Sequence, residues 1–148
     1  MVREIIWSID PKVETVASVM DRLRDMMVTA CRARGIRLSV TVADDAELHA
    51  LDLSPEQRKN LWLMVKEAMT NAIKHSGGSE LDVAVRVQGD AVLISVADNG
   101  RGWTGGQRGD GRGTGTMQMR ARALDGTMAI EPHQPSGTRV VFHIRLEK

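Results

Sequence analysis

The fold is decided by residues 91 to 102, AVLISVADNGRG, in which an apolar run ends at an aspartate and a glycine-rich turn. The apolar run has the length and composition of a buried strand. Asp98 shares the parity of Val92, Ile94 and Val96, so its side chain is expected on the buried face of that strand. Burying a carboxylate is costly unless it is hydrogen-bonded. We therefore expect a ligand to meet Asp98 at the end of the strand.

Two helices are predicted before this strand. Asp10 and Pro11 fit an N-cap and a first helical position, and apolar residues then recur at steps of three and four as far as Gly35. The positions of this helix expected to face the core are Val13, Val16, Met20, Leu23, Met27 and Ala30. A longer helix, about residues 53 to 76, opens at a capping box made by Ser54 and Gln57.

The remaining segments predict a sheet and a third helix. Strands are expected at residues 35 to 43, 80 to 88, 91 to 98, 127 to 131 and 138 to 146, and a helix near 114 to 124. The long strands have one apolar and one polar face, as in the row Leu81, Val83 and Val85. This pattern is typical of a two-layer α/β sandwich, here with a mixed sheet and about three helices on one face. Thr138 has the apolar parity of the last strand, which places it in the same layer as Asp98.

Composition restricts the class of protein. The chain has 148 residues, 42% of them hydrophobic, which suits one domain with a core. A formal net charge of +1 gives no reason to expect nucleic acid or an anionic membrane as a partner. No apolar stretch has the length needed to span a bilayer, and the single Cys31 excludes an internal disulfide. We expect a cytoplasmic domain.

Polar side chains follow one side of the long helix. Glu67 and Asn71 are four residues apart, and Lys74 and His75 come one turn later. A carboxylate and an amide at this spacing suit a hydrated magnesium ion, and a lysine suits a phosphate. On its own, however, the pattern is more typical of a solvated helix flank.

Eight of the 14 glycines lie between Gly100 and Gly115. A flexible linker is the usual interpretation of such a segment. This one joins a buried strand end to the start of a helix, where free N–H groups attract anions. We therefore expect a glycine-rich lid that is mobile when empty and ordered over a nucleotide.

Three motifs taken together resemble the N, G1 and G2 boxes of the GHKL ATPases: EAMTNAIKH at 67 to 75, DNGRG at 98 to 102 and GTG at 113 to 115. The continuation GTGTMQMRARALDGTMAI and the Gly137-Thr138 pair look most like bacterial two-component sensor histidine kinases of the nitrate-sensor and membrane-fluidity-sensor subfamily. The resemblance implies an ATP-binding catalytic domain at 35 to 148, and a helical lead-in from the dimerisation region at 1 to 34.

The resemblance also implies roles for single residues. Asn71 and Glu67 would hold Mg²⁺, Glu67 would also position or activate the reacting groups, and Lys74 would contact phosphate, which makes these three the implied catalytic residues. Asp98 would accept a hydrogen bond from the adenine amino group, with Thr138 nearby. The residues implied to bind ATP are Asn71, Lys74, His75, Asp98, Gly100, Gly102, Gly113, Thr114, Gly115, Thr116 and Thr138.

Kinases of this group move the γ-phosphoryl group of ATP to a histidine on a dimerisation helix. The four histidines here, His49, His75, His133 and His143, lack the sequence context that the resemblance requires of an acceptor. The expected partners are therefore the dimerisation and histidine-phosphotransfer segment of the same kinase and, downstream, a response regulator. We expect a homodimeric parent and a monomeric fragment.

Two alternatives stay open. An anti-sigma-factor serine kinase has the same boxes and nearly this length, although the helical lead-in and the run MRARAL argue against it. A non-catalytic ATP-sensing module need not keep both Glu67 and Asn71, and both are present. Thr116, Gln118 and Asp125 depart from the subfamily pattern around the lid hinge, which bears on the ordering of the lid more than on the identity of the nucleotide.

Overall fold

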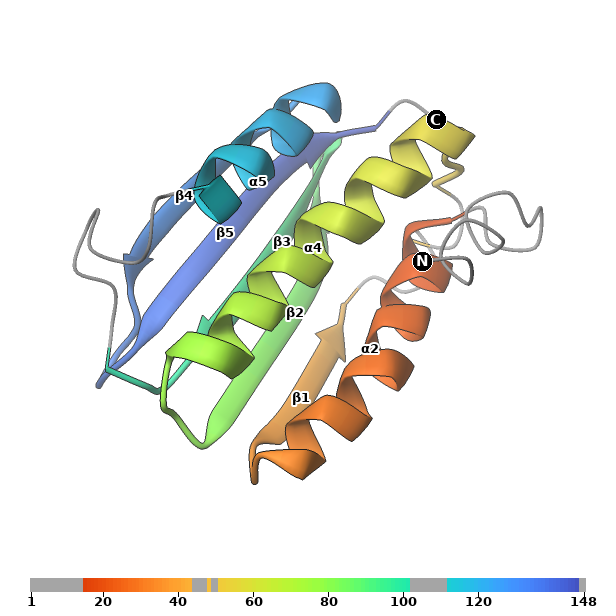
Figure 1. Cartoon of the computed structure of the whole chain (residues 1–148). Helices are drawn as coiled ribbons and strands as arrows, with labels where there is room; N and C mark the ends of the chain where they lie inside the picture. The colour runs from red at the N-terminus through yellow and green to blue at the C-terminus, as the bar shows by residue number, and fades with distance from the viewer. Residues whose placement is uncertain (1–14, 44–47, 49–50, 102–111, 147–148) are drawn as a thin grey trace.

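A computed structural model describes residues 15–43, 48, 51–101 and 112–146, without the side chains of 112–114. The elements are α2 (Val16–Ala33), β1 (Arg37–Val42), α4 (Pro55–His75), β2 (Glu80–Gln88), β3 (Ala91–Asp98), α5 (Arg112–Ala123), β4 (Thr127–Pro132) and β5 (Thr138–Arg145). The strands form one 5-stranded sheet in the order β1-β2-β3-β5-β4. β1 runs parallel to β2, and the other neighbouring pairs are antiparallel. The three labelled helices lie across one face of this sheet (Figure 1), which confirms the predicted two-layer sandwich.

The core lies between the sheet and the helices, where the strand parity predicted it. Alternate residues of β2, β3 and β5 face the helices, and α4 contributes the largest number of apolar side chains opposite them. The side chains that are 2% exposed or less include Leu81, Val83, Val85, Val92, Ile94, Val96, Phe142, Ile144, Leu61, Met64 and Val65. The outward parity of the same strands is exposed or half-buried over most of its length.

Helix α4 begins where its sequence predicts. Ser54 Oγ accepts a hydrogen bond from the Gln57 N–H at 3.1 Å, and Gln57 Oε1 accepts one from the Ser54 N–H at 2.9 Å. Pro55 occupies the first helical position, where a backbone N–H would lack an intrahelical partner. This capping box fixes the register of the helix, and with it the face on which Glu67 and Asn71 lie.

The predicted start of the first helix is wrong. Helix α2 starts at Val16, because Thr15 is an N-cap with extended backbone whose Oγ1 accepts from the Ser18 N–H at 3.2 Å. The Val16 N–H donates to the Leu51 carbonyl at 3.3 Å, which ties this helix start to the segment before α4. Asp10, Pro11 and Val13 lie outside the described residues. Ala30 is exposed, and Cys31, 1% exposed, occupies the core position instead.

Helix α5 differs from its prediction at its start. It begins at Arg112, so Gly113, Thr114 and Gly115 belong to its first turn and do not precede it. Its end is closed by two bonds: the Gly126 N–H donates to the Ala121 carbonyl and the Asp125 N–H to the Arg122 carbonyl, both at 2.9 Å. Such bonds satisfy the last carbonyls of a helix and turn the chain sharply into the next strand.

Candidate functional site

Asp98 lies at the end of β3, on the buried face, as its parity predicts. It is 5% exposed. Its Oδ1 accepts hydrogen bonds from the Gly100 N–H at 2.9 Å and the Thr138 N–H at 3.3 Å. In the parts of the chain that the structure describes, no group donates to the second oxygen, Oδ2. Among the described residues, the carboxylate is therefore held in place through one oxygen, and its second oxygen is an acceptor that a ligand could use.

Thr138 brings a second polar group to the same place. It is 4% exposed, and its Oγ1 is buried without a hydrogen-bond partner. An unsatisfied buried hydroxyl costs about 1–3 kcal/mol. Oδ2 of Asp98 and Oγ1 of Thr138 lie in the same buried layer and have no hydrogen-bond partner among the described residues. The pair suits a planar ligand with an amino group, which would donate to the carboxylate, and a neighbouring acceptor, which would meet the hydroxyl.

Three chain segments meet around Asp98 with no room for side chains. A Cβ on Gly100 would lie 2.1 Å from the Ser76 carbonyl oxygen, and one on Gly137 would lie 1.8 Å from the Asp98 carbonyl oxygen. The Arg101 N–H also donates to the Ser76 carbonyl, at 3.0 Å. The end of α4, the turn after β3 and the turn before β5 are thus in direct backbone contact.

These contacts show a structural requirement for glycine at position 100, because a side chain there would collide with the backbone of Ser76. The sequence suggested that it shapes a phosphate loop, a role that stays a prediction, whereas the structure shows it packed against Ser76 after α4. In the sequence, the pair Gly77-Gly78 directly follows Ser76, where it is typical of a helix end. Its significance depends on a contact between segments far apart in the chain, which periodicity does not reveal.

The polar stripe of α4 ends at the same junction. Glu67 and Asn71 are half-buried, whereas Lys74 and His75 are exposed in the last turn, directly before Ser76. No group of three or more His, Cys, Asp or Glu residues that could hold a metal ion occurs in the described ranges. A metal ion at Glu67 and Asn71 would therefore have two protein ligands and fill its other positions with water or ligand oxygens, as magnesium commonly does.

The predicted phosphate-binding residues are only partly covered by the structure. Gly102 lies outside the described residues, as does most of the expected lid. The backbone of Gly113 and Thr114 is helical, Gly115 is exposed with open space where a Cβ would be, and Thr116 is half-buried. These four residues occupy the N-terminal part of α5, and the first N–H groups of a helix have no intrahelical partner and favour an anion.

Two other side chains have structural roles. Arg120 Nη1 donates to Asn60 Oδ1 at 3.0 Å and so joins α5 to α4. Burial of the Cys31 thiol raises its pKa, which lowers its thiolate fraction and makes it a poor nucleophile at neutral pH. None of the helices that the structure describes is long and apolar enough to cross a membrane.

Residues 56–148 match the family described as histidine kinase-, DNA gyrase B- and HSP90-like ATPase, and the chain belongs to this family. It is 30% identical over 127 residues to the nitrate/nitrite sensor protein NarX of Escherichia coli K12, covering 85% of this chain and 21% of NarX. It is 31% identical over 98 residues to the histidine-protein kinase/phosphatase DegS of Bacillus subtilis, covering 64% of this chain and 26% of DegS. The chain thus spans about a fifth to a quarter of the length of these relatives.

Solved structures agree on the fold. The catalytic domain of the histidine kinase ThkA superposes with a TM-score of 0.75 at 12% identity, covering 89% of this chain and 94% of that one. The histidine kinase domain of the blue-light-activated kinase of Erythrobacter litoralis superposes with a TM-score of 0.73 at 17% identity, covering 97% and 69%. Full-length ShkA in complex with AMPPNP gives 0.74 at 16% identity, covering 90% and 30%. The fold is that of histidine kinase catalytic domains, and the domain is of the sensor histidine kinase type.

Proposed function

We propose that this domain binds ATP with the adenine base at Asp98, and donates the γ-phosphoryl group to a histidine on the dimerisation segment of its own kinase. The observation that carries the proposal is the state of Asp98, a carboxylate 5% exposed and fixed through Oδ1, whose Oδ2 accepts no hydrogen bond from any of the described residues. The unpartnered Thr138 hydroxyl beside it supports the same assignment.

Base selection follows from the polarity of these groups. Oδ2 of Asp98 is an acceptor only, so it suits the amino group of adenine and repels the carbonyl oxygen that guanine has at the equivalent position. A hydrogen bond to a charged group contributes about 1.5–3 kcal/mol, which corresponds to a roughly tenfold to hundredfold preference for ATP over GTP. The Thr138 hydroxyl would complete the recognition directly or through one water molecule.

The phosphates would extend from Asp98 toward α4 and the start of α5. Asn71 and Glu67 are the residues that would hold Mg²⁺, and His75, Gly102 and the residues from Gly113 to Thr116 would line the same end. Magnesium, when bound, neutralises charge on the phosphate oxygens. Lys74 is exposed in the last turn of α4, one helical turn after Asn71, and would contact a phosphate.

The transfer breaks the bond between the γ-phosphorus and the bridging oxygen and forms a bond from phosphorus to an imidazole nitrogen. ADP leaves with the electron pair of the broken phosphorus–oxygen bond on its terminal oxygen. The imidazole loses a proton. Glu67 is the group of this chain that we expect to orient the acceptor or take up that proton. The phosphoryl group would then pass to a response regulator. We expect all of this on the cytoplasmic side, where ATP is available.

The test is phosphoryl transfer by the whole kinase that contains this domain, with γ-labelled ATP and magnesium. We expect an acid-labile, base-stable label on a histidine of the dimerisation segment. Glu67→Gln should keep ATP binding and lose most of the label, whereas Asn71→Ala should lose both when magnesium is present. Binding without any transfer would instead support a non-catalytic ATP-sensing module, and label on a serine of a separate protein would support the serine kinase.

A further inference from the structure

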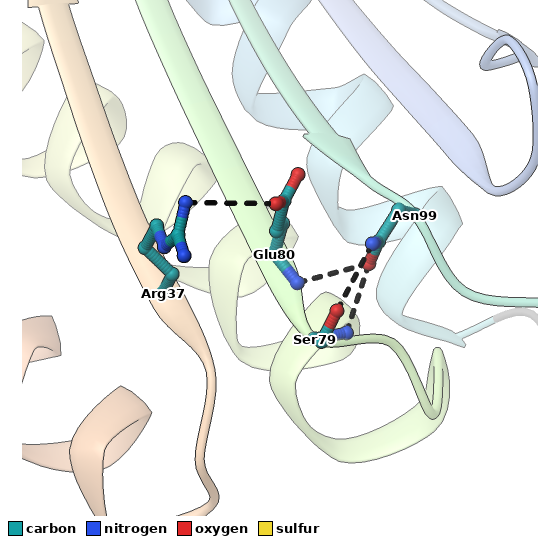
Figure 2. A network of polar contacts seen from close by, with 4 residues as sticks. All are labelled: Arg37, Ser79, Glu80 and Asn99. Carbon is teal, nitrogen blue, oxygen red and sulfur yellow. Dashed lines mark hydrogen bonds and ion pairs between the residues drawn. The ribbon is translucent and has the colours of Figure 1, made fainter.

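The residue after Asp98 makes a dense set of hydrogen bonds that none of the predicted roles uses. Asn99 Oδ1 accepts from the N–H groups of both Ser79 and Glu80 at 2.9 Å, and Asn99 Nδ2 donates to Ser79 Oγ at 3.1 Å. Figure 2 shows the amide pointing at the start of β2, beside the 3.9 Å contact between Arg37 and Glu80. Asn99 has the parity opposite to Asp98, so its side chain lies outside the layer that contains Asp98 and Thr138.

The main chain of Asn99 joins two more segments. Its N–H donates to the Glu80 carbonyl at 3.4 Å, and its carbonyl accepts a hydrogen bond from Ser136 Oγ at 3.0 Å. Through Ser136 it holds the turn that leads into Gly137 and Thr138. One residue is therefore bonded both to the segment after α4 and to the segment before β5.

Close packing makes this arrangement rigid. A Cβ on Gly78 would lie 2.5 Å from Asn99 Oδ1, and one on Gly137 would lie 2.8 Å from Asn99 Cα. The backbones of both glycines therefore lie so close to Asn99 that no side chain would fit between them, and this packing together with the hydrogen bonds holds both turns in place. Asp98 shares a peptide unit with Asn99, and Thr138 follows the turn that Asn99 holds.

We propose that Asn99 is a positioning residue for base recognition: it sets the orientation of the Asp98 carboxylate and the distance to Thr138, and thereby the preference for adenine over guanine. This inference rests on the proposed adenine site. Asn99 does not contact the base. Its loss should therefore change the selectivity of the site more than it changes the binding of phosphates.

The experiment measures the affinities of the purified chain for MgADP and MgGDP by calorimetry and compares their ratio between variants. Both nucleotides carry the same diphosphate, so a change in phosphate binding affects both affinities equally and cancels in the ratio. Asn99→Ala removes all the side-chain bonds and should lower the ADP:GDP affinity ratio about tenfold. Asn99→Ser, whose hydroxyl is too short to reach both N–H groups, should act in the same direction if the alanine variant does not fold. Asn99→Asp keeps two acceptor oxygens for Ser79 and Glu80, with the Ser79 hydroxyl as donor, and should keep the ratio within about twofold.

The matched control is Ser54→Ala, which removes a helix cap at the opposite end of α4 and lowers stability without reaching Asp98. Its ADP:GDP ratio should equal that of the wild type. If Asn99→Ala and Asn99→Ser keep the wild-type ratio while Asp98→Asn loses it, Asn99 is a structural residue only and the inference is wrong. If the wild type itself does not distinguish ADP from GDP, the proposed adenine site is wrong. The inference about Asn99 is then wrong as well, because it rests on that site.

Discussion

Thr138 donates its backbone N–H to Oδ1 of Asp98 at 3.3 Å, which links the start of β5 to the end of β3. The pair extends the register of these strands, in which Ala97 lies opposite Arg139. It brings a fixed carboxylate and an unpartnered hydroxyl together in the layer between sheet and helices. The donor of this bond is a backbone N–H, so a substitution such as valine can remove the Thr138 hydroxyl and keep the bond between the strands.

Replacing Thr138 with valine should therefore weaken ATP binding without weakening the fold. Valine has the same shape and lacks only the hydroxyl, whose burial without a partner is unfavourable. We expect about a fivefold loss of ATP affinity by calorimetry. The melting temperature should stay the same or rise. Unchanged affinity would mean that the hydroxyl does not reach the ligand.

Gly137→Ala should disturb both stability and binding. The added Cβ would lie 1.8 Å from the Asp98 carbonyl oxygen, so the backbone of one turn must shift. We expect a loss of about 3 kcal/mol in the free energy of unfolding, measured with urea, and a large loss of ATP affinity.

Gly35→Ala is the matched control for that variant. Gly35 also has a positive φ, of +69° against +109° at Gly137, but a Cβ there would meet nothing within 4 Å. It should cost about 1 kcal/mol for the backbone conformation alone and leave ATP affinity intact. Equal effects of the two substitutions would show that the close approach at Asp98 has no consequence.

Asp125→Gly should stabilise the domain. Asp125 has φ of +61°, in the left-handed region, where it ends α5. Glycine adopts this conformation without strain, so we expect a gain of about 1 kcal/mol in the free energy of unfolding. Asp125→Ala, which keeps a Cβ and loses the carboxylate, should give no such gain. A destabilised glycine variant would indicate that the carboxylate makes an unseen contribution.

Ser54→Ala should cost about 1 kcal/mol in unfolding free energy, because it removes the Oγ that accepts from the Gln57 N–H and leaves only the bond from the Ser54 N–H to Gln57 Oε1. Glu56→Ala, in the same first turn but outside the box, is the comparison and should cost less. Circular dichroism during urea unfolding measures both. An equal cost at the two positions would count against the capping box as the cause.

Local patterns predicted most of the fold because they depend on near neighbours in the chain. Alternation in residues 80 to 88 and 91 to 98 gave the bounds of β2 and β3, and the Ser54 box gave the start of α4. The start of α2 was mispredicted, because contacts with residues far along the chain support the N-cap at Thr15: the Val16 N–H donates to the Leu51 carbonyl, and Thr15 forms an isolated β-bridge with Asp52. Asp10 and Pro11 lie outside the described residues.

In the candidate site, too, local patterns predicted some residues, and contacts between distant segments determine the others. Asp98 and Thr138 were predicted together by strand parity, because side chains two residues apart share a face. Asn99 was missed, because its importance comes from Ser79, Glu80 and Ser136, which lie far from it in sequence. The roles of Gly102 and of the expected lid stay predictions, since those residues lie outside the described ranges.

The most direct measurement of the central claim is a calorimetric titration of the wild type and Asp98→Asn with ATP and GTP in the presence of magnesium. Asparagine keeps the size of the side chain and places an amide near the base. The account predicts that the wild type binds ATP at least tenfold more tightly than GTP, and that the variant loses roughly tenfold to hundredfold in ATP affinity. An Asp98→Asn domain that binds ATP as the wild type does would contradict it.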